Sequence, residues 1–589
     1  MKSFIDTLSS GEVDILNEYF TPMEFAAGTC IIREGDSGDG GYIIDEGEVR
    51  LELQDVETRS ESVLCYLEAG EFLGEFSLID GRPRSASAFA QTNVKARWLS
   101  TEKYEALCED RPEIGIKIAH ALAKGLSGKL RSQNQQIAAY LFAEDIDPET
   151  NEMVAGAVAA QKEFENWTDD AIDALLVDIA GTVRKKAKSL ARETVKDTKI
   201  GTVEDKTVKI RFACKDVLRS IKGKQCSGYL TRNENKQVRD IASPMGVIVG
   251  IIPVTNPIET IVFKTLISLK SRNACIFSCH RDALQVGCKV GEIIREVLVK
   301  HNAPPLLVEW IAKRVNRKKT AMLMKHPDVA FILATGGPGI VRAAYSSGTP
   351  SIGVGAGNAP VWVTSQADVA AAAEKIVASK SFDCGVICGS ENNLVVDASV
   401  REQFVSVLVS QGAAVLSPEE KQRFMSTVFD PETGHLQRNL VGQTAEVLAE
   451  AASITRPDTI RLIVVPATRE EIPGPLGHEK LAPILSLFET AGDDDSIAIC
   501  RTILLGQGIG HTAIIHTQNE QQAQRYGLEV PASRILINSG GSTGCIGIGT
   551  GLTPSLTLGC GTYGGNSTTD NVSYKHLMNI KRLAHYKQR

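Results

Sequence analysis

The hydrophobic pattern changes character partway along the chain, and this change constrains the fold more than any other feature. Up to about residue 100, short β-branched runs alternate with Gly, Asp and Ser clusters, as in CIIREGDSGDGGYIIDEGEVRLEL. This pattern is typical of all-β structure with tight turns. Beyond about residue 153, helical segments alternate with apolar strands, expected at 246–253, 274–278, 329–335 and 393–397. That alternation predicts a mostly parallel sheet covered on both faces.

The domain division follows from this change. A chain of 589 residues is too long for one core, so several domains are expected. Residues 101–143 are predicted to be largely helical and to close the first domain, 1–143. The acidic stretch EDIDPETNE at 144–152 has no hydrophobic period and is the predicted linker.

The composition indicates which kinds of partner to expect. With 43% hydrophobic and 23% charged residues, the chain has the composition of a soluble globular protein. A net charge of -7 gives no global basic field, which argues against nucleic acid as the main partner. The first residues lack the pattern of a signal peptide, and no apolar run reaches the roughly 18 residues that span a bilayer. A cytoplasmic protein without a membrane partner is expected.

The cysteines predict thiols rather than a disulfide framework or a metal site. There are 13, an odd number scattered over a long chain. Neither Cys275 and Cys279 nor Cys384 and Cys388 has a second pair or a suitably spaced histidine nearby. No bound metal is therefore expected.

The segment FLGEFSLIDGRPRSASAFA, 72–90, contains what a buried phosphate requires. Gly74 permits a close backbone approach, and Arg84 supplies a fork of donors beside the Ser85 hydroxyl and amide. A carboxylate such as Glu75 can accept hydrogen bonds from a sugar hydroxyl. Together these residues describe a nucleotide site, and the alternative is that Arg84 pairs with an acidic neighbour in an empty barrel.

With EGDSGDGGYIIDEGEV at 34–49, this segment resembles the cyclic nucleotide-binding domains of regulatory kinase subunits and catabolite activators, over about residues 5–143. The resemblance implies a jelly-roll-like barrel with flanking helices. Gly74 and Glu75 would bind ribose, and Arg84 and Ser85 the cyclic phosphate of an effector, either cyclic AMP or cyclic GMP. Gly41 stands where the family has an aromatic residue, which predicts a looser core there.

Three segments of the second part contain candidate site residues. SKSFDCGVICGSENN, 379–393, holds Cys388, and a buried free thiol is the common state of such a cysteine. IIPVTNPIETIVFK ends a predicted strand at a turn, where the Asn256 amide could donate to a developing oxyanion or simply form the turn. FILATGGPGIVRAA is a strand, glycine turn and helix of the kind that accepts a dinucleotide phosphate.

With further pieces, these segments resemble the acylating, CoA-dependent branch of the aldehyde dehydrogenase superfamily, above all the amino-terminal half of bifunctional aldehyde/alcohol dehydrogenases. The supporting pieces, within about 153–585, are GTVEDK, SPMGVIVGIIPVTNPIET, HPDVAFILATGGPG, AYSSGTPSIGVGAGNAPV, SFDCGVICGSE, HEKLAPILSL, GIGHTAIIHT, RILINSGG and TPSLTLGCGTYGGNS. The resemblance implies a Rossmann-like NAD-binding part at 153–383 and a catalytic α/β part at 384–560. The segment 561–589 is expected to pack on the dehydrogenase or at an interface of a homo-oligomer.

The resemblance also assigns roles. Cys388 would attack the aldehyde, while its main-chain NH and the Asn256 side chain stabilise the oxyanion. Hydride would pass to NAD, and the acyl group to CoA. The residues implied to bind the dinucleotide are Gly336, Gly337, Gly339, Glu479, His280 and His511, the last a weaker assignment because a histidine in a glycine turn is often structural.

Two departures from the wider family shape the expected reaction. Val354 stands where hydrolytic relatives have a glutamate that activates water, and valine cannot act as a base, which favours the CoA thiol as acceptor. Cys384 replaces an Asn or Tyr and is expected to pack rather than form a disulfide. Acetaldehyde is the expected substrate, with succinate semialdehyde or sulfoacetaldehyde as alternatives. A rival from another class is a cyclic-nucleotide sensor on a catalytically silent dehydrogenase platform.

Overall fold

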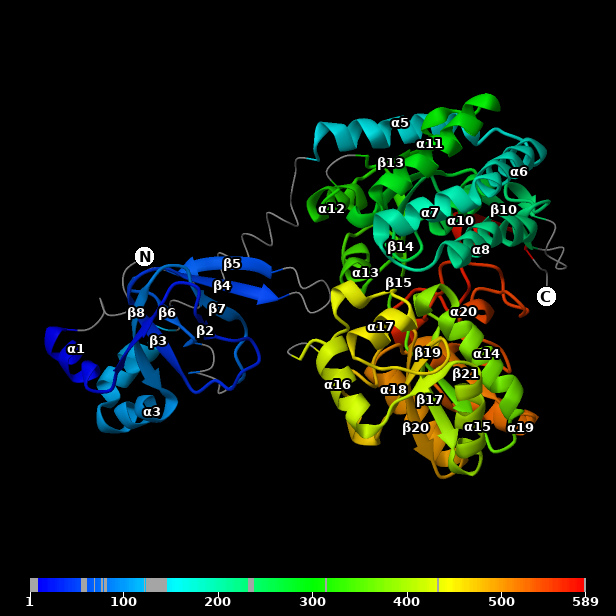
Figure 1. Cartoon of the computed structure of the whole chain (residues 1–589). Helices are drawn as coiled ribbons and strands as arrows, with labels where there is room; N and C mark the ends of the chain where they lie inside the picture. Colours follow the sequence, from blue (N-terminus) through cyan, green and yellow to red (C-terminus); the bar gives the residue numbers. More distant parts are fainter. Residues whose placement is uncertain are drawn as a thin grey trace. The chain divides into compact units, whose positions relative to one another are not determined.

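The computed structural model describes residues 9–54, 61–67, 69–75, 78, 82–120, 122, 146–230, 238–312, 315–431 and 434–586. The chain divides into two compact units, Met1–Asp145 and Ile146–Arg589 (Figure 1). Helix α5 (Pro148–Phe164) begins inside the segment predicted to be a linker, with Asp147 as its N-cap. The second half of that segment is therefore helical.

The amino-terminal unit contains two four-stranded sheets whose strand pairs are antiparallel, in agreement with the all-β prediction. One sheet has the order β1 (Thr21–Phe25), β8 (Val94–Ser100), β3 (Gly40–Glu46), β6 (Phe72–Leu73). The other has the order β2 (Cys30–Ile32), β7 (Ser87–Ala90), β4 (Val49–Gln54), β5 (Glu61–Leu67). Helices α1 (Ser10–Asn17) and α3 (Thr101–Asp110) flank them in sequence.

The core beside Gly41 is filled, although the sequence predicts a looser one. A Cβ placed on Gly41 would lie 2.3 Å from Cε1 of Phe72. The phenylalanine ring therefore occupies the space next to the glycine, and the core is not looser at this point.

The second unit is built on two parallel sheets. The five-stranded sheet has the order β13 (Val308–Trp310), β12 (Ala274–Cys279), β11 (Val247–Ile252), β14 (Val329–Thr335), β15 (Ser351–Val354). The seven-stranded sheet has the order β18 (Ala413–Val415), β19 (Leu462–Pro466), β20 (Ile484–Thr490), β17 (Glu391–Asp397), β16 (Ala359–Val363), β21 (Gly510–His516), β22 (Ala532–Ile537). Strands β11, β12 and β17 are buried along their whole length, as parallel strands covered on both faces must be.

The division between these sheets falls earlier than the boundary that the sequence predicts at residue 383. Strand β15 ends at Val354, and β16 begins the second sheet at Ala359. The helices of this unit after α5 are α6 (Asp169–Lys185), α7 (Ala187–Thr198), α8 (Val203–Phe212), α9 (Leu218–Ile221), α10 (Pro257–Lys270), α11 (Leu284–Lys300), α12 (Arg317–Lys325), α13 (Pro338–Tyr345), α14 (Val369–Ser381), α15 (Ala398–Ser410), α16 (Pro418–Val428), α17 (Ala445–Ala451), α18 (Asp493–Gly506), α19 (Glu520–Glu529) and α20 (Gly541–Gly544).

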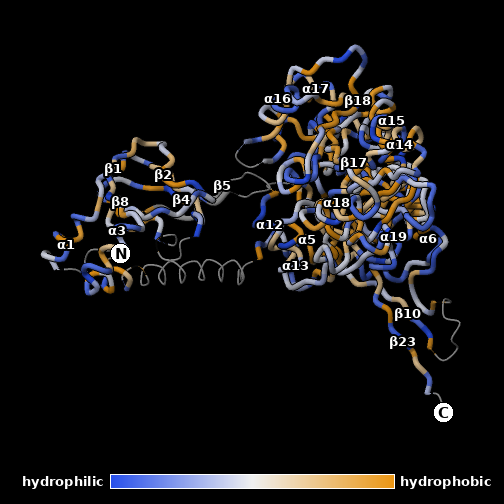
Figure 2. The backbone as a smooth tube through the Cα atoms, turned by 90° about the horizontal axis from the view of Figure 1, so that it is seen from below, coloured by the Kyte–Doolittle hydropathy of each residue, from blue (hydrophilic) through white to orange (hydrophobic). Residues whose placement is uncertain are grey.

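The carboxyl-terminal segment returns to the first part of this unit. Strand β23 (Met578–Ala584) pairs along its whole length with β10 (Val238–Pro244), which also pairs with β9 (Gly228–Leu230). Figure 2 shows β10 and β23 extending beyond the rest of the unit, with the chain end at their tip.

Candidate active site

Predicted site residues, the oxyanion donor Asn256 and the dinucleotide residues His280 and Gly336, lie at one edge of the five-stranded sheet. Asn256 follows β11, His280 follows β12, and Gly336 follows β14. Because the three strands are parallel neighbours, their carboxyl ends meet at the same edge. The strand order reverses between β11 and β14, and a crevice at such a point is the usual ligand site of an open α/β sheet.

The other predicted residues lie at the amino ends of neighbouring strands in the seven-stranded sheet. Cys388 comes just before β17, Glu479 shortly before β20, and His511 at the start of β21. Residues 355–358 join the end of β15 to the start of β16. The chain therefore passes directly from the carboxyl edge of the first sheet to the amino edge of the second.

Gly357, in that connection, is the point where these residues meet. Its main-chain N donates to Oε1 of Glu479 over 3.2 Å. A Cβ on Gly357 would lie 1.7 Å from the carbonyl oxygen of Cys388 and 3.4 Å from Nδ1 of His511. Only glycine fits here, and its small size brings Cys388, Glu479 and His511 together.

Cys388 is partly exposed and packs against the main core of the unit. Burial, with the nearby Cys545, Glu479 and Cys560, raises the pKa of its thiol well above the usual value, while Arg534 acts in the opposite direction. The resting sulfur is therefore protonated near neutral pH.

The pKa values of Glu479 and His511 are shifted in opposite directions. Burial raises the pKa of Glu479 to about 7, although Lys380, the Gly357 amide and Lys480 favour its ionised form. Burial and the charge of Arg534 lower the pKa of His511 well below its usual value, so its ring is neutral. Nδ1 of His511 lies 2.9 Å from the Thr512 hydroxyl, and Nε2 has no hydrogen-bond partner among the described residues.

Two buried lysines beside Glu479 are not predicted by the sequence. Nζ of Lys480 donates to the carbonyl oxygens of Leu476 and His478 over 2.8 and 2.7 Å. Nζ of Lys380 donates to the carbonyl oxygen of Lys480 over 3.0 Å. Burial lowers the pKa of Lys380 to about 7. Both lysines lie within segments that the sequence analysis singles out, Lys380 in SKSFDCGVICGSENN and Lys480 in HEKLAPILSL.

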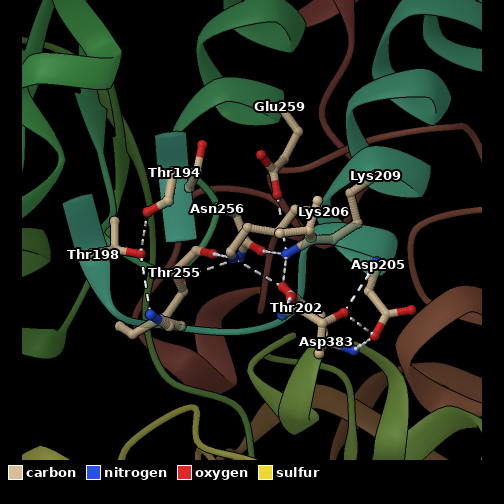
Figure 3. Close-up of polar contacts among 12 residues, drawn as sticks. Thr194, Thr198, Thr202, Asp205, Lys206, Lys209, Thr255, Asn256, Glu259 and Asp383 are labelled. Atoms are coloured by element: carbon tan, nitrogen blue, oxygen red, sulfur yellow. Dashed lines mark hydrogen bonds and ion pairs between the residues drawn. The ribbon is translucent and has the colours of Figure 1, made fainter. Parts of the chain in front are cut away.

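Asn256 is the N-cap of α10, and its side chain is held on both sides (Figure 3). Its Oδ1 accepts a hydrogen bond from Nζ of Lys209, and its Nδ2 donates to Oγ1 of Thr255 over 3.1 Å. Nζ of Lys209 also donates to Oδ2 of Asp383. The structure thus links Asn256 to the segment that carries Cys388 through Lys209 and Asp383, two residues that sequence reasoning missed.

The backbone leading to Cys388 is unusual. Asp383, Cys384 and Gly385 all have positive φ values, of 47°, 55° and 68°. Two consecutive non-glycine residues in this region carry a conformational cost, and such strain is concentrated at functional sites. Cys384 is a buried free thiol, as its predicted packing role requires.

The turn between β14 and α13 fits a dinucleotide phosphate. Gly337 is the N-cap of α13 and contributes no side-chain cap, so a phosphate can approach the positive end of this helix. Gly336 precedes it, and Gly339 lies in the first turn. His280 is half-exposed at the same sheet edge, where its Nδ1 accepts from the Asp282 amide over 3.2 Å.

Val354, which the resemblance places where hydrolytic relatives have a glutamate, is buried. Val354 is 3% exposed at the end of β15, and its carbonyl oxygen accepts from the Gly336 amide over 3.5 Å. It is the last residue of β15, three residues before Gly357.

In the amino-terminal unit, the predicted nucleotide residues are only partly brought together. Nη1 of Arg84 donates to the Gly40 carbonyl oxygen over 2.6 Å, and Nη2 pairs with Oδ1 of Asp39 over 2.9 Å. Arg84 and Glu75 are buried, whereas Ser85 is exposed. Asp39 is the acidic partner that the alternative interpretation expects, so nucleotide binding stays a prediction.

Gly74 is required by two features of this unit. Its φ is +88°, a conformation that other residues rarely adopt. A Cβ there would lie 2.6 Å from Nη1 of Arg84. In this structure, the close approach that Gly74 permits is therefore made by the Arg84 guanidinium.

Among the described residues, no helix combines the length and the apolar character needed to cross a bilayer. The same residues contain no group of three His, Cys, Asp or Glu side chains that could hold a metal ion.

Comparison with known proteins connects both units to families. Residues 133–551 match the aldehyde dehydrogenase family, and residues 22–111 match the cyclic nucleotide-binding domain. The bifunctional aldehyde-alcohol dehydrogenase AdhE of Escherichia coli K12 is 38% identical over 441 residues, which cover 74% of this chain and 49% of that protein. The chain thus spans about half the length of such curated relatives.

Other relatives are matched over nearly their whole length. The succinate-semialdehyde dehydrogenase (acetylating) of Clostridium kluyveri is 30% identical over 74% of this chain and 95% of its own. The crystal structure of an acetylating aldehyde dehydrogenase from Geobacillus thermoglucosidasius has a TM-score of 0.72 and 41% identity, over 75% of this chain and 97% of that one. This chain therefore belongs to the aldehyde dehydrogenase family and carries an amino-terminal cyclic nucleotide-binding domain.

Proposed function

We propose that this chain is an NAD-dependent, CoA-acylating aldehyde dehydrogenase. It converts an aldehyde, CoA and NAD+ to an acyl-CoA, NADH and a proton, and catalyses the reverse reaction. The observation that carries the proposal is the cluster around Gly357, where Cys388, Glu479 and His511 meet. The Clostridium and Geobacillus relatives, both named as acetylating enzymes, support the acyl-transferring branch.

Cys388 acts as the nucleophile in this proposal. Its sulfur, once deprotonated, adds to the aldehyde carbon, and the oxyanion formed accepts hydrogen bonds from the Asn256 amide and the Cys388 main-chain NH. The carbon then loses a hydride and becomes a thioester of Cys388. The glycine turn before α13 would hold NAD+, which would supply the acceptor for this hydride. The CoA thiol finally displaces Cys388 from the acyl group.

Glu479 and Val354 direct this chemistry. An ionised Glu479, with a pKa of about 7, can accept hydrogen bonds from the nicotinamide ribose. Val354 offers no proton acceptor, so water is not activated at its position. A thiol is much more acidic than water and needs less help from a base, which favours CoA over water as the acyl acceptor.

A small uncharged substrate, acetaldehyde, fits the charges around Cys388 better than an anionic one. Arg534 is the cation whose charge acts on the Cys388 thiol. However, its Nη2 donates to the Gly559 carbonyl oxygen over 2.7 Å and its Nη1 to that of Thr569 over 3.2 Å. An arginine held by backbone carbonyls in this way is poorly placed to bind a carboxylate or sulfonate.

A substrate panel tests the proposed reaction. Purified protein with acetaldehyde, NAD+ and CoA is expected to form NADH, measured by absorbance, and omission of CoA is expected to lower the rate at least about 100-fold. Succinate semialdehyde and sulfoacetaldehyde should give lower kcat/KM values. CoA-independent NADH formation would exclude the acylating reaction, and a folded protein inactive on every aldehyde would favour the silent platform.

We further propose that the amino-terminal unit binds a cyclic nucleotide as an effector. The supporting observations are the family match and the buried Arg84 and Glu75. Because the Arg84 guanidinium is already ion-paired to Asp39, a cyclic phosphate would have to share or replace that partner.

Calorimetry with cyclic AMP and cyclic GMP tests this site. The intact chain is expected to bind at least one of them, and Arg84→Gln is expected to weaken binding by at least about 100-fold, because a charged donor to the phosphate is lost. Arg82→Gln removes an exposed arginine two residues away and serves as the matched control. Equal binding by the intact chain and R84Q would contradict the assignment, as would no binding by the intact chain.

A further inference from the structure

A single buried cation joins the two parts of the site that must act together on the aldehyde oxygen. Lys209, on α8, is 1% exposed. Its Nζ donates to Oδ1 of Asn256 and to Oδ2 of Asp383, and lies 3.0 Å from Oε1 of Glu259 (Figure 3). Asn256 belongs to the turn after β11, Glu259 to α10, and Asp383 to the segment before Cys388.

Lys209 and Asp383 stabilise each other's charged forms. Burial alone would lower the pKa of Lys209, but the charges of Asp383 and Glu259 outweigh it and raise that pKa. Burial likewise opposes ionisation of Asp383, and Lys209 and Lys206 nevertheless hold its pKa below the usual value. An ammonium has three donor hydrogens, and three oxygens surround this one.

The contact with Lys209 fixes which way the Asn256 amide faces. An ammonium group can donate but cannot accept, so only Oδ1 of Asn256 can face it. The NH2 group must then point away from Lys209. One of its two hydrogens is directed to Thr255 Oγ1, and the other is the one that the proposed function uses for the oxyanion.

The contact with Asp383 connects Lys209 to the segment that carries the second oxyanion donor. The Asp383 carboxylate accepts from the Thr202 amide over 3.1 Å, and its own N donates to Oδ2 of Asp205 over 2.8 Å. These two contacts, neither of which involves a lysine, hold Asp383 in its left-handed conformation at φ 47°. The strained turn that follows leads to the main-chain NH of Cys388, five residues further on.

We propose that Lys209 is a positioning residue that orients the Asn256 amide and holds it in register with the Cys388 segment. The inference rests on the proposed function, because it assumes that Asn256 and the Cys388 NH stabilise one oxyanion. Lys209 itself acts only through these partners and does not touch the substrate.

The chain offers a matched control in Lys206. This lysine is also buried on α8, and its Nζ donates to Oδ2 of Asp383 over 3.1 Å, but its other acceptor is the Thr255 carbonyl oxygen rather than the Asn256 side chain. Lys209→Met and Lys206→Met each remove one ammonium from Asp383. Only K209M frees the Asn256 amide to rotate.

K209M is expected to lower kcat for acetaldehyde oxidation about 10- to 50-fold, with the Kd for NAD+ changed less than about twofold. K206M is expected to lower kcat less than about fivefold. In an Asn256→Ala background, K209M should lower kcat less than about twofold further, because residues that act through one group are not additive. If Lys209 were needed only for the stability of the fold, K209M would lower kcat by a similar factor in the wild-type and N256A backgrounds.

Folding is checked for every variant by thermal melting. K209M leaves the buried Glu259 carboxylate without its cation, so K209M/E259Q, compared with Glu259→Gln alone, replaces it if K209M does not fold. Equal losses in K209M and K206M would overturn the inference, as would a K209M effect that persists in N256A. A wild-type chain without turnover would instead overturn the proposed function and the inference with it.

Discussion

Replacing Cys388 with alanine is expected to lower acetaldehyde oxidation by at least roughly 10³-fold, because the sulfur forms the covalent bond from which hydride leaves. The Kd for NAD+ should change little, since the glycine turn before α13 is untouched. Mass spectrometry of the wild-type chain, quenched after aldehyde and NAD+ are added without CoA, should find an acyl group on Cys388. The adduct should disappear when CoA follows.

Cys384→Ala is the matched control for this substitution. Cys384 is a buried free thiol four residues before Cys388, and burial raises its pKa to about 12. The charged groups that act on its thiol are Asp383, Asp205, Lys206 and Lys209, and not Glu479. C384A is therefore expected to lower activity less than about fivefold and to form the same adduct. Undiminished turnover by C388A, or an acyl group found on another cysteine, would contradict the proposed nucleophile.

Local hydrophobic pattern predicted the strands but not the sheets to which they belong. The runs VIVGII and ACIFSC are apolar throughout, and they form the buried strands β11 and β12. Strand β16 has the same apolar character, yet a connection of only four residues carries the chain from β15 into another sheet. Apolar periodicity reports burial, whereas sheet membership depends on partners such as Ile514, distant in sequence, so no local pattern indicates where the second sheet begins.

Local sequence patterns also do not show which distant segments meet, and this explains which site residues were predicted and which were missed. Cys388, Asn256 and Glu479 lie in segments with recognisable turns and glycines, but the residue that brings Cys388 and Glu479 together is Gly357, through contacts with strands far along the chain. Lys209 lies on a helix, where a lysine ordinarily faces solvent. Its burial depends on Asp383, 174 residues later, a partner that no local pattern indicates.

Replacing Asn256 with alanine is expected to lower kcat about 10²- to 10³-fold, the usual cost of losing one oxyanion donor. Oxyanion stabilisation is needed only as the carbonyl oxygen gains charge, so the Kd for NAD+ should stay within about twofold of the wild type. Asn256→Asp should lower kcat by at least the same factor. It keeps the size of the side chain but replaces the donor with a carboxylate, which Lys209 would hold as an ion pair.

Thr255→Val tests whether the Asn256 NH2 group itself, and not its contact with Thr255, is needed for activity. It removes the hydroxyl that accepts from Nδ2 of Asn256 and leaves the amide itself and its bond to Lys209 in place. We therefore expect T255V to lower kcat less than about fivefold, since the NH2 group stays oriented by Lys209. The rate of adduct formation at Cys388, followed in a single turnover, should fall in N256A and not in T255V. If N256A instead formed the adduct at the wild-type rate, Asn256 would be a turn residue of α10 and the oxyanion would depend on other donors.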